Sequence, residues 1–325
     1  MSNFFAIVVK SGKMIFDTDG LSYEDLIKIS GLKDNEVNSE ELAFTRIEIL
    51  PKEDIFSSEP KNWYVKLDES IKPIWFTTEY ERKCLNTFFE KVYPECVFID
   101  KKDLVFKNRK NLFLKDCSAE LYNSTAKLYN MSSAILYNTS SVELYDTSSA
   151  EVYDLSSVKL YDSSTAEVYD SSKAELQNLS SANLYNTSSA ILWNTSSVIL
   201  NGMSSANLYD SSSANLYDSS SGKLYNSSSA NLYNSSLAII FSKNAEFLTK
   251  DLSVVIDRSK KILDIRTAKM EEIKMSNDDT INDLITRIKK IEDIVKYHSQ
   301  KIYEKEEREL FKTKQNINTS SMFRS

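Results

Sequence analysis

The strongest constraint on this chain is an apolar side chain that recurs every eight residues through its middle. The row consists of Leu128, Leu136, Leu144, Val152, Leu160, Val168, Leu176, Leu184, Leu192, Leu200, Leu208, Leu216, Leu224 and Leu232. A second row, mostly Ala and Val, lies two positions earlier and runs from Ala126 to Ala238. Because side chains two residues apart on a strand point to the same face, each unit predicts a short strand with both rows in a core.

Each predicted strand ends in a turn with left-handed backbone. Two positions after the Leu row stand Asn130, Asn138, Asp146, Asp154, Asp162, Asp170, Asn178, Asn186, Asn194, Asp210, Asp218, Asn226 and Asn234, with Gly202 in the one remaining place. Gly, Asn and Asp are the residues that tolerate positive φ. Ser and Thr then fill the corner, where they can bond the backbone.

The outward residues between the two rows indicate how many units make one coil. At a step of sixteen residues, oppositely charged residues alternate along one face, namely Lys127, Glu143, Lys159 and Glu175. A triangular coil of 24 residues would instead align Glu151 with Glu175. Opposite charges on neighbouring strands stabilise a sheet, so we expect a flattened coil of two units, although its other face would place Glu151 beside Glu167.

The repeat resembles the pentapeptide-repeat solenoids, whose unit is visible in Ala206–Asp210 and Ala214–Asp218, both Ala-Asn-Leu-Tyr-Asp. The resemblance implies a mainly β fold, a right-handed parallel β-solenoid over about 120 residues. Three extra residues per unit depart from the family and put its square cross-section in doubt. The segment Ile15–Gly20 is similar to modules that precede such repeats in phage or prophage proteins. Some members of the broad group mimic DNA and inhibit enzymes that act on it.

Four parts are expected along the chain. Residues 1–103 predict a small α+β domain, 104–243 the solenoid, 244–277 a capping β-hairpin region, and 278–325 a coiled-coil-like helix and tail. In the first part, a capping box at Ser22 and Asp25 opens a helix that Gly31 ends, and Pro94 ends a second helix.

The last part carries an apolar seam at heptad spacing, formed by Ile281, Leu284, Ile288, Ile291, Val295, His298 and Ile302. Such a seam predicts a dimer or trimer. Ile285 and Ile294 widen the stripe, which is equally compatible with a single helix that docks on its own chain.

Charge is unevenly distributed. The formal net charge is −7, and residues 117–241 alone contain 11 acids and 4 lysines, which also gives −7. Phosphate contacts need Lys and Arg, so we expect no direct binding of nucleic acid by the solenoid, while a basic or nucleic-acid-binding protein stays possible as a partner.

Cellular location is inferred from what the sequence lacks. Three cysteines without CxxC spacing indicate reduced thiols, and neither a signal peptide nor a membrane-spanning run is recognised. We therefore expect a cytoplasmic protein of a bacterium or a phage-infected host, or a virion component in the alternative function below.

No catalytic residue, cofactor or metal ligand is expected, because a uniform repeat supplies neither a pocket nor groups placed for acid–base chemistry. The sequence favours a protein-binding scaffold, most specifically an acidic nucleic-acid mimic that inhibits a host nucleic-acid enzyme. A phage structural or adhesin subunit joined by the C-terminal helix is the alternative. The candidate partner-binding residues are Glu143, Asp146, Glu151, Asp154, Asp162, Glu167, Asp170, Glu175, Gln177 and Trp193.

Simpler interpretations remain open for each of these features. The acidic residues could serve solubility alone. The tyrosine that follows each Leu could only stabilise the sheet, and the replacement of this tyrosine at Gln177, Trp193 and Asn201 could be drift in a tolerant repeat.

Overall fold

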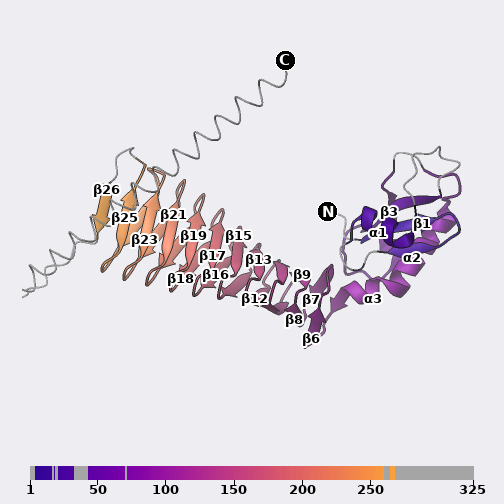
Figure 1. Cartoon of the computed structure of the whole chain (residues 1–325), viewed down its shortest axis with the longest axis horizontal. Coiled ribbons are helices and arrows are strands. Elements are labelled where there is room, and N and C mark those ends of the chain that lie inside the picture. The colour runs from indigo at the N-terminus through magenta and orange to yellow at the C-terminus, as the bar shows by residue number, and fades with distance from the viewer. Residues whose placement is uncertain are drawn as a thin grey trace, which may run out of the picture. The chain divides into compact units, whose positions relative to one another are not determined.

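The computed structural model describes residues 4–16, 18, 21–32, 43–69, 72–259 and 264–267, the last four by their backbone. The described chain is mainly β and consists of a small N-terminal domain followed by a parallel β-solenoid (Figure 1). The predicted C-terminal helix with its apolar seam from Ile281 to Ile302, and the tail after it, lie outside the described residues.

The N-terminal domain is built on a four-stranded antiparallel sheet of order β2-β1-β3-β4. Its elements are β1 (Phe4–Val9), β2 (Met14–Phe16), α1 (Tyr23–Ser30), β3 (Phe44–Pro51), the 3₁₀ turn η1 (Pro60–Asn62), β4 (Trp63–Leu67), α2 (Thr78–Lys91) and α3 (Tyr93–Cys96). Phe4, Ile47, Trp63 and Phe88 are buried in its core.

The helix ends follow from local chemistry. The capping box at Ser22 and Asp25 is present, and Gly31 ends α1 with a φ of 71°, as predicted. Helix α2 ends at Lys91, ahead of Pro94. Pro94 does not simply terminate helical structure, because it stands in the first turn of α3, where its missing N–H costs no hydrogen bond.

The solenoid has two sheets that receive successive strands alternately. The twelve-stranded sheet contains β5 (Val97–Ile99), β7 (Leu112–Lys115), β9 (Thr125–Tyr129), β11 (Ser141–Leu144), β13 (Ser157–Leu160), β15 (Lys173–Leu176), β17 (Ser189–Leu192), β19 (Ser205–Leu208), β21 (Ser221–Leu224), β23 (Leu237–Ile240), β25 (Val254–Asp257) and β26 (Asp264–Thr267). The ten-stranded sheet contains β6 (Leu104–Lys107), β8 (Ser118–Tyr122), β10 (Ser133–Tyr137), β12 (Ser149–Val152), β14 (Thr165–Val168), β16 (Ser181–Leu184), β18 (Ser197–Leu200), β20 (Ser213–Leu216), β22 (Ser229–Leu232) and β24 (Glu246–Thr249).

The two-sided coil of sixteen residues is confirmed. From β9 to β23, neighbouring strands of one sheet pair in parallel with residues sixteen apart as partners, so that Lys127 lies beside Glu143 and Glu151 beside Glu167. Figure 1 shows these short strands stacked from purple β6 and β8 to orange β25 and β26. At the end of the stack β26 pairs antiparallel with β25, in the segment where the sequence predicts a hairpin.

The predicted core is confirmed as well. Every side chain of the Leu row is fully buried, and those of the small row are buried beside it, so one continuous core fills the interior. Every Asn, Asp and Gly predicted to have positive φ does so, with values between 50° and 67°.

Buried serines add a polar row at the corners. Ser148 is fully buried, and its hydroxyl donates to the carbonyl oxygen of Tyr145 at 2.6 Å. The same contact recurs at Ser164, Ser180 and Ser188. A hydroxyl that finds its acceptor three residues back can be buried without the cost of an unpaired polar group.

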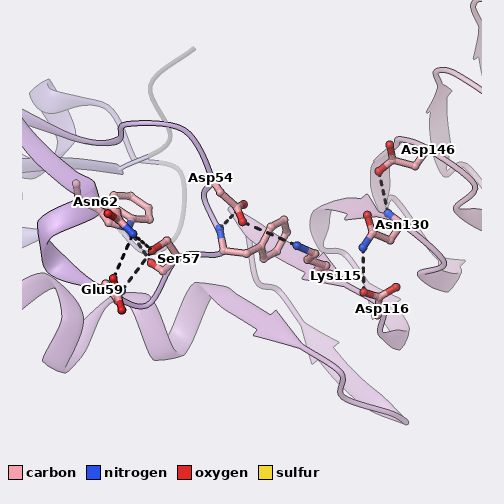
Figure 2. Close-up of polar contacts among 10 residues, drawn as sticks. Asp54, Ser57, Glu59, Asn62, Lys115, Asp116, Asn130 and Asp146 are labelled. Carbon is pink, nitrogen blue, oxygen red and sulfur yellow. Dashed lines mark hydrogen bonds and ion pairs between the residues drawn. The ribbon is translucent and has the colours of Figure 1, made fainter.

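The N-terminal domain packs against the first coils. Phe113 of β7 belongs to its core, with its ring 5.5 Å from that of Phe4. Lys115 lies 3.9 Å from the carboxylate of Asp54 and over the ring of Phe56. Figure 2 shows this contact and, beside it, the first turns of the solenoid. Val97 of the edge strand β5 is buried in the same core.

Candidate functional site

Four outward charges on successive strands of the twelve-stranded sheet form two ion pairs. Lys127 and Glu143 form an ion pair of 2.8 Å, and Lys159 and Glu175 form one of 3.5 Å. Burial tends to raise the pKa of Glu143, but hydrogen bonds from Lys127 and Tyr145 outweigh it and hold this pKa below its usual value. The charges of Lys127, Glu143, Lys159 and Glu175 therefore cancel.

The ten-stranded sheet lacks such compensation. Its outward row reads Glu120, Ile135, Glu151, Glu167 and Asn183 on successive strands. Glu151 and Glu167 are exposed neighbours, and within the described part of the chain neither forms an ion pair. Like charges side by side on adjacent strands destabilise a sheet, so the pair carries a cost that an ion pair would avoid.

Tyrosines bond these glutamates without neutralising them. The hydroxyl of Tyr153 donates to Glu151 at 2.8 Å, that of Tyr122 donates to Glu120 at 2.9 Å, and that of Tyr169 donates to Glu167. The bond to Glu151, aided by burial, raises the pKa of Tyr153 to about 12. Each tyrosine thus keeps its proton and holds a charged carboxylate at a fixed place on the surface.

The aspartates at the corners have a structural task. The backbone N–H groups of Asn130, Asn138, Asp146 and Asp154 donate to the carboxylates of Asp146, Asp154, Asp162 and Asp170, each one coil further on. Figure 2 shows Asn130 donating both to Asp146 and, through its side chain, to Asp116. The carboxylates of these aspartates are exposed, but their role in the backbone hydrogen bonds already accounts for the presence of Asp at these positions.

The ten predicted binding residues fall on two different faces. The ten-stranded sheet and its corners bring together Glu151, Asp154, Glu167 and Asp170, which we call the acidic face together with Glu120. The twelve-stranded sheet and its corners carry Glu143, Asp146, Asp162, Glu175, Gln177 and Trp193. Sequence reasoning left out Glu120 because the coil between β8 and β10 is one residue short and breaks the period.

A shallow groove runs along the ten-stranded sheet. A cavity of about 660 Å³ extends from Asp103 to Asn183 and is lined by Glu120, Glu151 and Glu167. A second, of about 450 Å³, shares Ser181 and Asn183 with it and continues to Asn231. The acidic face therefore opens onto a trough that follows the axis of the solenoid.

The aromatic residues form one ladder on each sheet. Ring centroids of neighbours lie 4.3 to 5.6 Å apart, and the rings are within 14° of parallel. Cation–π contacts cap three of the ladder ends. Lys107 lies over the ring of Tyr122, Lys250 over that of Tyr233 and Arg258 over that of Phe241. Stacked rings cover each other's faces, so most of each ladder offers only hydroxyls and ring edges to a partner.

Each ladder is interrupted once. Gln177 separates Tyr161 from Trp193 on the twelve-stranded sheet, and Asn201 separates Tyr185 from Tyr217 on the ten-stranded sheet. Trp193 is itself stacked on Tyr209 at 4.3 Å, so it belongs to the ladder and is about one third exposed.

The described residues include all three thiols of the chain. Cys84, Cys96 and Cys117 are free and buried, and burial raises the pKa of Cys84 to about 12, so it is a protonated thiol at neutral pH. Within the described ranges no group of three or more His, Cys, Asp and Glu could hold a metal ion. His298 lies outside them.

A search of the described helices found none with the length and apolar character needed to cross a bilayer. Comparison of the chain with models of known protein families, with curated proteins and with solved structures found no match. The geometry of the two faces therefore carries the functional argument.

Proposed function

We propose that this chain is a non-catalytic scaffold that binds a basic surface of a protein partner through its acidic face. The observation that carries the proposal is the contrast between the two sheets. Glu143 and Glu175 have lysine partners, whereas Glu151 and Glu167 are exposed, adjacent and without a counter-charge in the described residues. Concentrated charge of one sign attracts an oppositely charged partner and accelerates its association.

The most specific form of the proposal is an acidic nucleic-acid mimic that inhibits a host nucleic-acid enzyme. The resemblance of the repeat to pentapeptide-repeat solenoids, and of the N-terminal module to phage proteins, supports this form. Carboxylates on coils about 4.8 Å apart are sparser than the phosphates of duplex DNA, which supply one charge per ~1.7 Å of axis. The acidic face would therefore compete for a basic channel without copying the phosphate spacing.

The test compares two double variants of equal net charge. Glu151→Gln with Glu167→Gln removes the unpaired charges, and Glu143→Gln with Glu175→Gln removes two charges that are already paired. The probe is a fluorescently labelled lysine-rich peptide, whose affinity is measured by anisotropy across a salt series. The first variant should bind several-fold more weakly and with a smaller salt dependence. Equal loss in both variants would contradict a role for the acidic face.

The inhibitor form needs a second measurement. A partner recovered on the immobilised protein from nuclease-treated bacterial lysate should be released by excess duplex DNA, since both would occupy one basic channel. A partner that stays bound at saturating DNA would show that the protein is not a nucleic-acid mimic.

A further inference from the structure

We propose that the gap at Asn201 is a binding slot for an aromatic side chain. The slot would form one continuous site with the acidic face for an extended peptide that carries a basic and an aromatic residue. The basic half of this site rests on the proposed function, whereas the aromatic half rests on the ladder alone.

The ladder defines the dimensions of the slot. The ring of Tyr185 stacks on Tyr169 at 4.8 Å, and the ring of Tyr217 stacks on Tyr233 at 4.7 Å. Leu184, Leu200 and Leu216 precede the three positions and are register partners, so Tyr185 and Tyr217 lie two coils apart, or about 9.6 Å. This separation is twice the stacking distance, and it admits one more ring in contact with both.

The inner ring faces at the gap have no aromatic neighbour. In the described part of the chain, Tyr185 stacks only on Tyr169 and Tyr217 only on Tyr233. Asn201 reaches less far from the backbone than a tyrosine does, so it does not fill the missing place. A ring inserted there gains two stacking contacts.

Apolar side chains surround the gap. Ile199, two residues earlier on the same strand, is 37% exposed, and Met203 at the following corner is 68% exposed. Gly202 between them has a φ of 67° and stands in the one corner position without a polar side chain. A half-exposed aliphatic and a flexible thioether beside an aromatic slot are the contacts that an aromatic anchor uses.

The corresponding gap on the other sheet is less suitable. Gln177 is longer than Asn201, and its side-chain amide donates to Glu175 at 3.5 Å, so the space is used by a polar contact. Its neighbours on that face are the paired charges of Lys159 and Glu175. Only the gap at Asn201 shares a sheet with the acidic face.

The groove runs from the acidic face past Ile199, on the strand that precedes the slot. The cavity over Glu151 and Glu167 reaches Asn183, and the next cavity runs from Asn183 past Ile199. Glu167, Asn183 and Ile199 are register partners, and Asn201 lies two residues beyond Ile199 on the same chain segment. The slot therefore lies two coils, about 9.6 Å, further along the axis than the last glutamate, and about 6.6 Å further along the strand direction, an offset that a long basic side chain can span. A polyproline II segment repeats every three residues with a rise of about 3.1 Å per residue, so it places positions i and i+3 on one side, ~9.3 Å apart.

The occupant that fits is a polyproline II segment with a basic residue followed three positions later by an aromatic residue. The probe is a labelled peptide with the core Arg-Pro-Pro-Trp, and its two reference forms carry Ala in place of Trp or of Arg. Binding is measured by fluorescence anisotropy to the full-length chain.

The decisive variant is Asn201→Tyr, which completes the ladder with the chain's own ring. We expect it to weaken binding of the Trp peptide about tenfold and to leave the Ala-for-Trp peptide unchanged. Gln177→Tyr fills the gap on the other sheet and should change neither affinity. Thermal unfolding should show that Asn201→Tyr is as stable as the wild type or more so, because it adds two stacking contacts.

The two halves of the site fail separately. If Asn201→Tyr leaves the Trp peptide unaffected, or if Trp and Ala peptides bind the wild type equally, the slot is wrong whatever the acidic face does. If Glu151→Gln with Glu167→Gln leaves the Arg-containing peptides unaffected, the proposed function is wrong while the aromatic contact can still be measured with the Ala-for-Arg peptide.

Discussion

The two sheets of the solenoid share one core and one repeat, yet they present different surfaces. On the twelve-stranded sheet, Lys127 and Lys159 alternate with Glu143 and Glu175, and the charges cancel. On the ten-stranded sheet, Glu167 follows Glu151 with no lysine between them. Both rows come from the same outward position of the repeat. The difference shows that the interior fixes the fold through two apolar rows, while the outward position is free to vary in charge.

The largest expected effect tests whether the two faces depend on one core. Leu160 is fully buried in β13, and Leu160→Asp would place a carboxylate there without a partner. We expect a loss of more than about 4 kcal/mol of unfolding free energy and collapse of both sheets, because each coil is supported only by its neighbours. The loss of β structure is followed by circular dichroism during heating.

The control places the same carboxylate one residue earlier, on the surface. Lys159→Asp breaks the ion pair with Glu175 and places like charges beside Glu143 and Glu175, so it should cost about 1–2 kcal/mol, well below the effect of Leu160→Asp. Similar unfolding temperatures for the two variants would contradict the assignment of inside and outside.

The second prediction concerns alkaline pH. Burial raises the pKa of Tyr129 to about 12, and the bond to Glu151 together with burial raises that of Tyr153 to about 12. A tyrosine in the unfolded chain titrates near pH 10, so the unfolded state loses its protons first. The contribution of these two raised pKa values to the free energy of unfolding is fully present below about pH 10. It is lost as the pH rises from about 10 to about 12.

The two tyrosines separate the faces in this experiment. Glu151→Ala removes the main cause of the shift at Tyr153 on the ten-stranded sheet and leaves Tyr129 on the other sheet unchanged. Ring-labelled tyrosine NMR titration should show a lower pKa for Tyr153 alone. A joint shift of both residues would mean that the ladders, and not the local bonds, set these values.

The third prediction converts one face into the other. Lys127→Gln with Lys159→Gln leaves Glu143 and Glu175 without lysine partners. If unpaired glutamates make a binding face, the variant should bind two lysine-rich peptides where the wild type binds one, as measured by calorimetric stoichiometry. The stability cost should be at most about 1 kcal/mol per pair, and an unchanged stoichiometry would show that charge alone is insufficient.

The smallest effect belongs to the corners. Asp170 accepts the backbone N–H of Asp154 at 3.2 Å, and asparagine tolerates the same positive φ. Asp170→Asn should therefore change stability by less than about 0.5 kcal/mol, whereas Asp170→Ala should cost about 1 kcal/mol or more. Denaturant unfolding distinguishes them, and equal losses would argue against a structural role for this carboxylate.

The regular part of the fold was predictable because one physical rule repeats there. The Leu row, the positive φ at Asn, Asp and Gly, and the pairing of Lys127 with Glu143 all follow from the eight-residue period. The period also implies that Glu151 lies beside Glu167, and four of the five residues of the acidic face, all but Glu120, were predicted from the sequence.

The irregular coils were not predictable in the same way. A fixed period of sixteen does not predict the pairing partners in these coils. The register steps there are 15 residues from β6 to β8 and from β8 to β10, 14 from β7 to β9, and 17 from β22 to β24 and from β23 to β25. Glu120 was missed for this reason. Phe113, which joins the core of the N-terminal domain, carries no signal in the repeat, because its neighbours there are set by tertiary packing.

Because successive strands alternate between the two sheets, it matters whether the number of repeats changes by an odd or an even number. Loss of residues 153–160 would keep the apolar rows in phase but would move every later outward residue to the opposite sheet. Glu167 would then stand beside Glu143, and the gap at Asn201 would leave the sheet that carries Glu151. Loss or gain of sixteen residues would only shorten or lengthen the rod. A change in length by pairs of repeats therefore preserves the outward face of every residue in the protein. A change by a single repeat moves all later residues to the opposite face.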